Sequence, residues 1–150
     1  MRRATGKDGG VNNVKPGAMM MLGGGALLFI SSFLNWYKFG PFTQSGIDTD
    51  LTGLQGIVIL LIGADIVAVT AIRSFAADSV KLPERVLGLT LNQSMLLLGF
   101  AAFLMMFGLQ FADNTSIGVF LGWIGAAVVV AGVVMEDRSP ATGSTPTTEF

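Results

Sequence analysis

Long apolar segments alternate with short polar ones along the chain, and four of the apolar segments are long enough to cross a membrane. Because each helical residue rises about 1.5 Å, about 20 apolar residues span the roughly 30 Å hydrocarbon core of a bilayer. The pattern therefore predicts an all-α protein, an integral membrane four-helix bundle. The expected spans cover about residues 17–36, 54–72, 86–107 and 117–135.

The segments outside these spans are short or polar. The connecting loops carry the turn-forming residues Gly, Pro, Asp and Asn, and none is long enough to form a domain. Residues 1–15 and 136–150 contain too little apolar surface to offset the entropy of ordering, so we expect two disordered tails. The predicted organisation is one transmembrane domain over residues 16–135 between these tails.

Composition supports a membrane protein and excludes several kinds of site. The chain is 51% hydrophobic and 13% charged, with a mean hydropathy of +0.65, so the lipid bilayer must cover apolar surface that one soluble core would not hide. The net charge of −1 gives no basic field for nucleic acid. With neither Cys nor His, we expect no metal site and no cofactor. Since no paired nucleophile and base is visible, we expect no enzyme activity.

The basic residues predict the orientation. All of them except Lys38 lie before the first span, between the second and third spans, or after the fourth. Because Lys and Arg are retained on the cytoplasmic side, we expect a multi-pass protein of the plasma membrane with both termini in the cytoplasm. The expected interface anchors are the aromatic residues Trp36 and Tyr37 on the outer side and the basic residues Arg73, Lys81 and Arg85 on the inner side.

The two halves of the apolar region resemble each other. This similarity predicts a tandem repeat of two helical hairpins in the same orientation, with chance matching of apolar segments as the alternative. The matching positions are Met21 with Met95, Gly25 with Gly99, Phe29 with Phe103, Phe33 with Phe107, Gly56 with Gly118, and Ile62-Gly63-Ala64 with Ile124-Gly125-Ala126.

Asp65 is the only ionisable residue inside the predicted spans. Its burial in lipid costs roughly 3 kcal/mol, so it calls for a partner or a function. The antiparallel third span would place Gln93 at the same depth. One interpretation is a hydrogen bond that fixes helix pairing, worth about 0.6 to 2 kcal/mol; the other is proton or cation binding during transport. The remaining members of this predicted intramembrane polar cluster are Asn92, Thr90 and Ser94.

Small residues recur at intervals of four in the fourth span, at Gly118, Gly122 and Ala126. Such rows allow helix backbones to approach closely, so we expect a helix-packing face there. Packing inside the bundle and packing against another subunit both remain open.

The end of the first span, Phe33-Leu34-Asn35-Trp36-Tyr37, resembles the FLPWY-like ending found in small four-span membrane proteins of actinobacteria, with Asn35 in place of Pro. The Ser/Thr/Pro-rich C-terminal tail is similar as well. Because the function of those proteins is mostly unassigned, the resemblance implies an architecture and no functional residues.

The sequence thus favours a non-enzymatic membrane protein that acts as a scaffold or accessory subunit of a larger membrane complex. Its partner would be another membrane protein or further copies of the chain. The alternative is a small oligomeric, proton- or cation-linked transporter or channel that uses Asp65. A third hypothesis is a lipid-binding module that uses Lys81 and Arg85.

Overall fold

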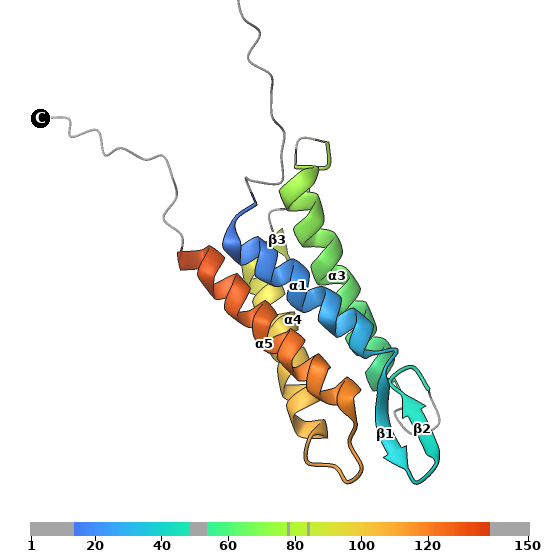
Figure 1. Cartoon of the computed structure of the whole chain (residues 1–150). Helices are drawn as coiled ribbons and strands as arrows, with labels where there is room; N and C mark the ends of the chain where they lie inside the picture. The colour runs from blue at the N-terminus through green and yellow to red at the C-terminus, as the bar shows by residue number, and fades with distance from the viewer. Residues whose placement is uncertain (1–13, 49–53, 78, 84, 139–150) are drawn as a thin grey trace, which may run out of the picture.

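The computed structural model describes residues 14–48, 54–77, 79–83 and 85–138. In these ranges the chain forms helices that run along one another, with two short β-hairpins at their ends (Figure 1). Most of each predicted tail, residues 1–13 and 139–150, lies outside the described residues. The helices are α1 (Pro16–Ser31), α3 (Gln55–Phe75), α4 (Leu91–Leu109) and α5 (Ile117–Arg138).

Three of these helices, α3, α4 and α5, are long and apolar enough to cross a membrane, and α1 is apolar but has only 16 residues. Large apolar side chains on the outside of the helices remain more than half exposed, including Ile30 at 52%, Leu61 at 59% and Leu97 at 58%. Soluble proteins rarely expose large contiguous apolar patches. The helices and their apolar outer surface indicate a membrane protein.

Helix α1 lies between α3 and α5, and α4 packs against α5. Helices α3 and α4 have few contacts with each other, so the bundle is closed tightly on one side and loosely on the other. In a repeat of two equivalent hairpins, α1 corresponds to α4 and α3 corresponds to α5. The contact between α1 and α5 would then resemble the contact between α4 and α3. The observed packing is asymmetric, whatever the origin of the matching residues.

Glycines explain the close approach of α1 and α5. A Cβ atom at Gly24 would lie 2.6 Å from the carbonyl oxygen of Gly125, and one at Gly17 would lie 2.7 Å from that of Gly132. Each helix places its two glycines seven residues apart, which is about two helical turns and therefore the same face. Only residues without a side chain allow the two backbones to touch along this line.

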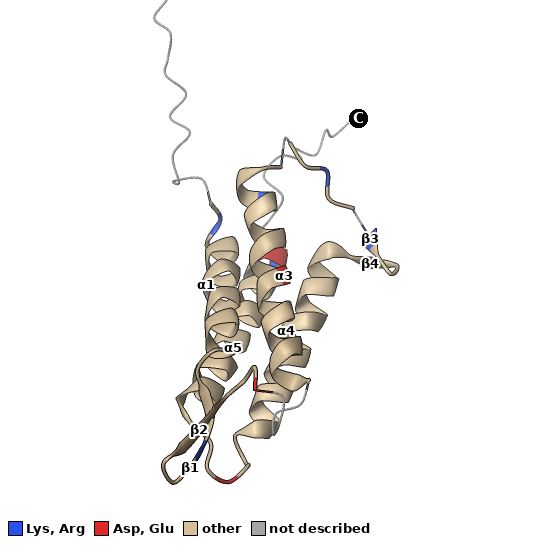
Figure 2. Cartoon of the chain, turned by 90° about the vertical axis from the view of Figure 1, so that its right-hand side faces the viewer, with Lys and Arg blue, Asp and Glu red and all other residues tan. Residues whose placement is uncertain are grey.

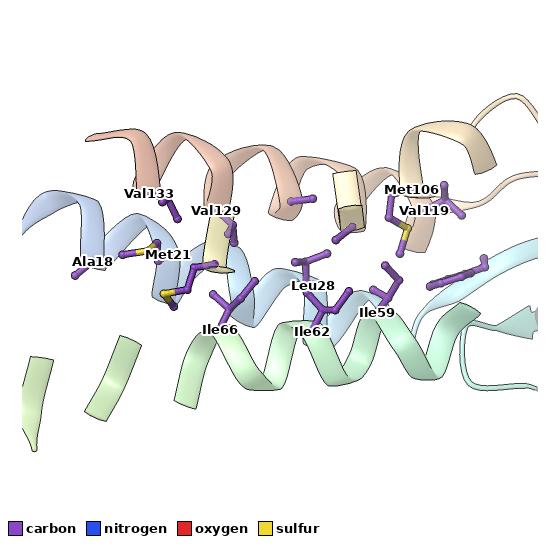
Figure 3. Close-up of a cluster of buried hydrophobic side chains, with 14 residues drawn as sticks. Ala18, Met21, Leu28, Ile59, Ile62, Ile66, Met106, Val119, Val129 and Val133 are labelled. Carbon is purple, nitrogen blue, oxygen red and sulfur yellow. The ribbon is translucent and has the colours of Figure 1, made fainter. Parts of the chain in front are cut away.

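The core lies between α1 and its two neighbours, and α4 adds residues from the side (Figure 3). Met21 and Leu28 of α1 are almost fully buried against α3 and α5. The predicted packing row of Gly118, Gly122 and Ala126 belongs to the buried face of α5, inside the chain. The other core side chains are Ala18, Trp36, Ile59, Ile62, Ile66, Met95, Ala102, Met106, Val119, Val129 and Val133.

The first hairpin shows that the all-α prediction is wrong in part and that the first predicted span, residues 17–36, extends beyond the helix. Helix α1 ends at Ser31, and the chain continues as β1 (Asn35–Phe39) and β2 (Phe42–Ser45), which pair in antiparallel fashion. Gly40 has a φ of +59°, which suits the turn between the strands. The apolar and aromatic residues after α1 therefore belong to a strand, where aromatic side chains are favourable.

The prediction of Trp36 as an aromatic anchor at the membrane surface is wrong. Its side chain is fully buried, and its Nε1 donates a 2.8 Å hydrogen bond to the carbonyl oxygen of Ser31 at the end of α1. Gly118 of α5 packs on the indole, since a Cβ there would lie 2.7 Å from Trp36 Cδ1. The residue fastens the first hairpin to the ends of α1 and α5.

The third helix starts later than the predicted residue 86, because a second hairpin occupies that part of the chain. Strands β3 (Arg85–Val86) and β4 (Leu89–Thr90) pair across a turn in which both Leu87 and Gly88 have positive φ. Helix α4 begins only after this hairpin, because Thr90 accepts from the backbone N–H of Gln93 and the Gln93 side chain accepts from that of Thr90. This reciprocal capping box is a strong helix-start signal.

Candidate functional site

Polar side chains meet at the end of the bundle where α1 begins and α3 and α5 end. Arg73 Nη2 forms an ion pair of 3.2 Å with Glu136 Oε1, and Arg73 Nη1 donates a 2.7 Å hydrogen bond to Asn92 Oδ1. The Sδ atom of Met95 lies 3.9 Å from the same Nη1. One guanidinium therefore joins α3, α4 and α5.

Glu136 was expected in the disordered C-terminal tail, and its place in the structure is a correction. Helix α5 continues to Arg138, beyond the predicted end at residue 135, so Glu136 stays on a helix. Its side chain is 11% exposed, and that of Arg73 is 31% exposed. A signal was present in the sequence, since an acid directly after one span and a base directly after another fall at the same membrane level.

Asp65 does not meet Gln93. Among the described residues Asp65 has no hydrogen-bond partner, and its side chain is exposed on α3. The amide oxygen of Gln93 accepts from the backbone of Thr90 instead. The bond between Arg73 and Asn92 fixes the first turn of α4 at the level of Arg73, which is about 12 Å along α3 from Asp65. The predicted pairing failed because α4 begins later than residue 86.

The other residues of the predicted polar cluster do not act together. Thr90 caps α4, and Asn92 binds Arg73. The Oγ atom of Ser94 is buried and has no hydrogen-bond partner in the described part of the chain. The predicted cluster is therefore not formed, and no hydrogen bond in the described part of the chain joins these residues to Asp65.

A cavity of about 240 Å³ opens beside the ion pair, between α1, α3 and α5. Lys15, Thr70, Arg73, Ser74 and Glu136 supply its polar lining, and its apolar lining comes from Val14, Ala18 and Met21. Two buried oxygens of lining residues, Thr70 Oγ1 and Glu136 Oε2, have no hydrogen-bond partner among the residues described. This arrangement offers charge and hydrogen bonds for a bound polar group.

The remaining predicted anchors lie at both ends of the bundle. Lys81 lines a second cavity, of about 420 Å³, together with Arg73. Arg85 opens β3 and is exposed. Tyr37 of β1 stacks on Phe39 with ring centroids 6.2 Å apart, and burial raises its pKa above the usual 10.0. Tyr37 is thus held in the first hairpin, and its backbone also forms a β-bridge with Thr115.

Basic residues of the described chain gather at the end that carries Arg73 (Figure 2). Lys38 of β1 lies at the opposite end. Asp48, which follows β2, and Asp113, which lies between α4 and α5, belong to that end as well. The two ends of the bundle therefore differ in charge in the way that the sequence distribution indicates. The basic end is formed by Lys15, Arg73, Lys81, Arg85 and Arg138.

Comparison with known proteins adds no assignment. No protein family model matches the chain, and neither a curated protein nor a solved structure shows significant similarity to it.

Proposed function

We propose that this chain is a non-enzymatic accessory subunit of a larger membrane complex, and that it docks its partner through the outer face of α3. The observation that carries the proposal is the exposed Asp65 side chain at the middle of a 21-residue apolar helix. An acid on a lipid-facing surface costs roughly 3 kcal/mol by insertion scales. A partner helix that supplies a cation or a hydrogen-bond donor removes this cost.

The proposal places the chain in the plasma membrane with four crossings. Helix α1 has 16 residues, or about 24 Å, and Ser32 to Leu34 carry the chain on toward the hairpin. The basic end of the bundle faces the cytoplasm, since positive residues are retained there. Both termini then lie in the cytoplasm, and the resemblance to small four-span actinobacterial proteins is compatible with this topology.

The surface around Asp65 suits a helix partner. Leu61, one turn away, is 59% exposed, and Val58, two turns away, is 38% exposed. These side chains form an apolar strip that leads up to the acid from one side. Interhelical hydrogen bonds in membranes contribute about 0.6 to 2 kcal/mol. The acid supplies specificity, and the apolar strip supplies packing.

The alternative, a proton- or cation-linked transporter that uses Asp65, requires a path next to this side chain. The backbones of α1, α3 and α5 touch at glycines, for example where a Cβ at Gly63 would lie 2.7 Å from the backbone nitrogen of Phe29. Such packing leaves no room for a path between these helices. Transport would have to run between separate copies of the chain, so the accessory-subunit proposal needs fewer assumptions.

Photo-crosslinking in native membranes tests the proposal. A photoreactive residue in place of Leu61 should give one discrete adduct with another membrane protein, and the additional change Asp65→Leu should remove it. Leu97 of α4 provides the matched control, because its 58% exposure equals that of Leu61 within a percentage point. Position 97 should give only lipid adducts or diffuse ones.

Three results would count against the proposal. Equal adducts from positions 61 and 97 would show unspecific proximity. An adduct of twice the chain mass would show self-association in place of a partner. Proton or cation flux in liposomes of the purified chain that is lost in Asp65→Asn would favour the transporter.

A further inference from the structure

The cavity beside the ion pair has a net positive lining. Lys15 and Arg73 contribute two positive charges, and Glu136 contributes one negative charge. Lys15 is also the N-cap of α1, whose side chain makes no capping hydrogen bond, and Pro16 follows it. The first turn of a helix exposes backbone N–H groups and the positive end of the helix dipole. The lining therefore favours an anion.

Two orphaned oxygens show what else the occupant must provide. Thr70 is 1% exposed, and its hydroxyl, which can donate or accept, has no partner among the described residues. Glu136 Oε1 is paired with Arg73, whereas Oε2 is buried and unpaired. Buried polar atoms nearly always have a hydrogen-bond partner. A ligand that completes this cavity must donate a hydrogen bond to Glu136 Oε2, and it can accept one from the Thr70 hydroxyl.

We propose that the cavity binds a phosphate group whose carrier also has a hydrogen-bond donor, as in a phospholipid headgroup with a glycerol hydroxyl or an ethanolamine ammonium. The phosphate oxygens would accept from the Lys15 ammonium, the Thr70 hydroxyl and the Arg73 guanidinium. Arg73 has five N–H groups, so its bonds to Asn92 and Glu136 leave donors for a phosphate. The headgroup donor would pair with Glu136 Oε2.

The position of the cavity suits a lipid. It lies where α1 begins and where α3 and α5 reach their last turns, which for membrane-crossing helices is the depth of the headgroups. This site differs from a general attraction of anionic lipid to Lys81 and Arg85, because buried residues take part and because the headgroup must carry a donor. Asp65 does not line this cavity, and along α3 it lies about 7.5 Å from Thr70 and about 12 Å from Arg73.

Lipid titration of the full chain tests the proposal. The protein is purified in a maltoside detergent, stripped of lipid and titrated with three lipids, and bound lipid is measured by native mass spectrometry. Phosphatidylglycerol and phosphatidylethanolamine should bind at least about tenfold more tightly than phosphatidylcholine, which has the phosphate but no donor. Equal binding of all three lipids would overturn the proposal.

Two variants locate the binding in the cavity without breaking the ion pair. Lys15→Gln removes one charge, and Thr70→Val removes the hydroxyl while keeping the side-chain shape. Each should weaken binding of phosphatidylglycerol by about tenfold. Arg85→Gln is the matched control, with the same charge change at the same end of the bundle, and it should leave binding unchanged. Binding that is insensitive to both cavity variants would overturn the proposal.

Inorganic phosphate distinguishes the two sources of the ligand. If it fails to compete with phosphatidylglycerol at millimolar concentration, the lipid assignment stands. If it binds more tightly than the lipid and loses affinity in Lys15→Gln, the lipid assignment is overturned in favour of free phosphate. Asp65→Leu should bind phosphatidylglycerol as the unchanged protein does, which separates failure of this site from failure of the proposed docking surface.

Discussion

Arg73 and Glu136 are 63 positions apart in the chain, and their charged groups lie 3.2 Å apart at the basic end of the bundle. The pair connects the last turn of α3 to the last turns of α5, which are otherwise separated by α1. Asn92 adds α4 to the same guanidinium. This polar contact closes the end of a bundle whose α3 and α4 have few other contacts.

Arg73→Ala should destabilise the fold by about 2 kcal/mol, between the values for exposed and buried ion pairs, because it leaves the Glu136 carboxylate without its partner. Unfolding in mixed micelles of increasing dodecyl sulfate content measures the change. Arg85→Ala, an exposed Arg at the same end, should shift the transition by less than about 0.5 kcal/mol. Equal effects of the two substitutions would show that the ion pair contributes nothing.

Gly24→Ala should destabilise the bundle by about 1 to 3 kcal/mol, since the new methyl group would meet the backbone of α5 at 2.6 Å. The neighbouring Gly23 is an ideal control, because a Cβ there has nothing within 4 Å. Gly23→Ala should be neutral or stabilising by up to about 1 kcal/mol, as Ala is the better helix former. The same unfolding assay compares the two variants, and a similar loss in both would argue against close α1–α5 packing.

Trp36→Phe should cost about 1 kcal/mol, because the buried Ser31 carbonyl oxygen loses the indole donor and keeps only the backbone N–H of Leu34. Trp123 provides the comparison, since its indole packs at 5.9 Å from Phe103 and its Nε1 has no partner in the described part of the chain. Trp123→Phe should therefore cost less than Trp36→Phe. Circular dichroism during thermal unfolding ranks the two variants, and the reverse order would contradict the role given to Trp36.

Tyr37 should titrate above its ordinary pKa of 10.0 in the folded protein, because burial disfavours the phenolate. The unfolded chain then loses this proton first as the pH rises. The Tyr37 contribution to stability should be full below about pH 10 and should decrease as the pH rises toward the folded pKa. The chain has a single tyrosine, so the change of absorbance near 295 nm with pH reports the ionisation of this group alone. A midpoint at or below 10.0 would contradict the burial of its ring.

Local patterns predicted most of the helical structure. The span expected at residues 54–72 contains all of α3 except its C-terminal end, and that expected at 117–135 begins at the first residue of α5. The boundaries that failed are those where polar capping overrides hydropathy. Thr90 and Gln93 begin α4 late, and the two serines at the end of α1 both hydrogen-bond to the Leu28 carbonyl oxygen. A window of hydropathy is insensitive to single side-chain hydrogen bonds.

The candidate site was harder to predict, because its members come from different helices. Asn92 and Arg73 were both selected from the sequence, for different reasons, and the structure joins them. Hydropathy predicts that Glu136 belongs to the C-terminal tail, because it directly follows the apolar run. The depth of Gln93 was calculated from an expected helix start at residue 86, and the true start at residue 91 moves it by more than one helical turn.

The sequence by itself determined the helical segments, the apolar surface and the uneven distribution of basic residues, because hydropathy and charge act along the chain and need no knowledge of neighbours. Only the tertiary structure decided which glycines bring α1 against α5, that α3 and α4 have few contacts, and that Arg73 forms an ion pair with Glu136. Those contacts depend on the rotation and the starting residue of each helix. A shift of one residue turns a side chain by about 100°, which no composition or repeat can specify.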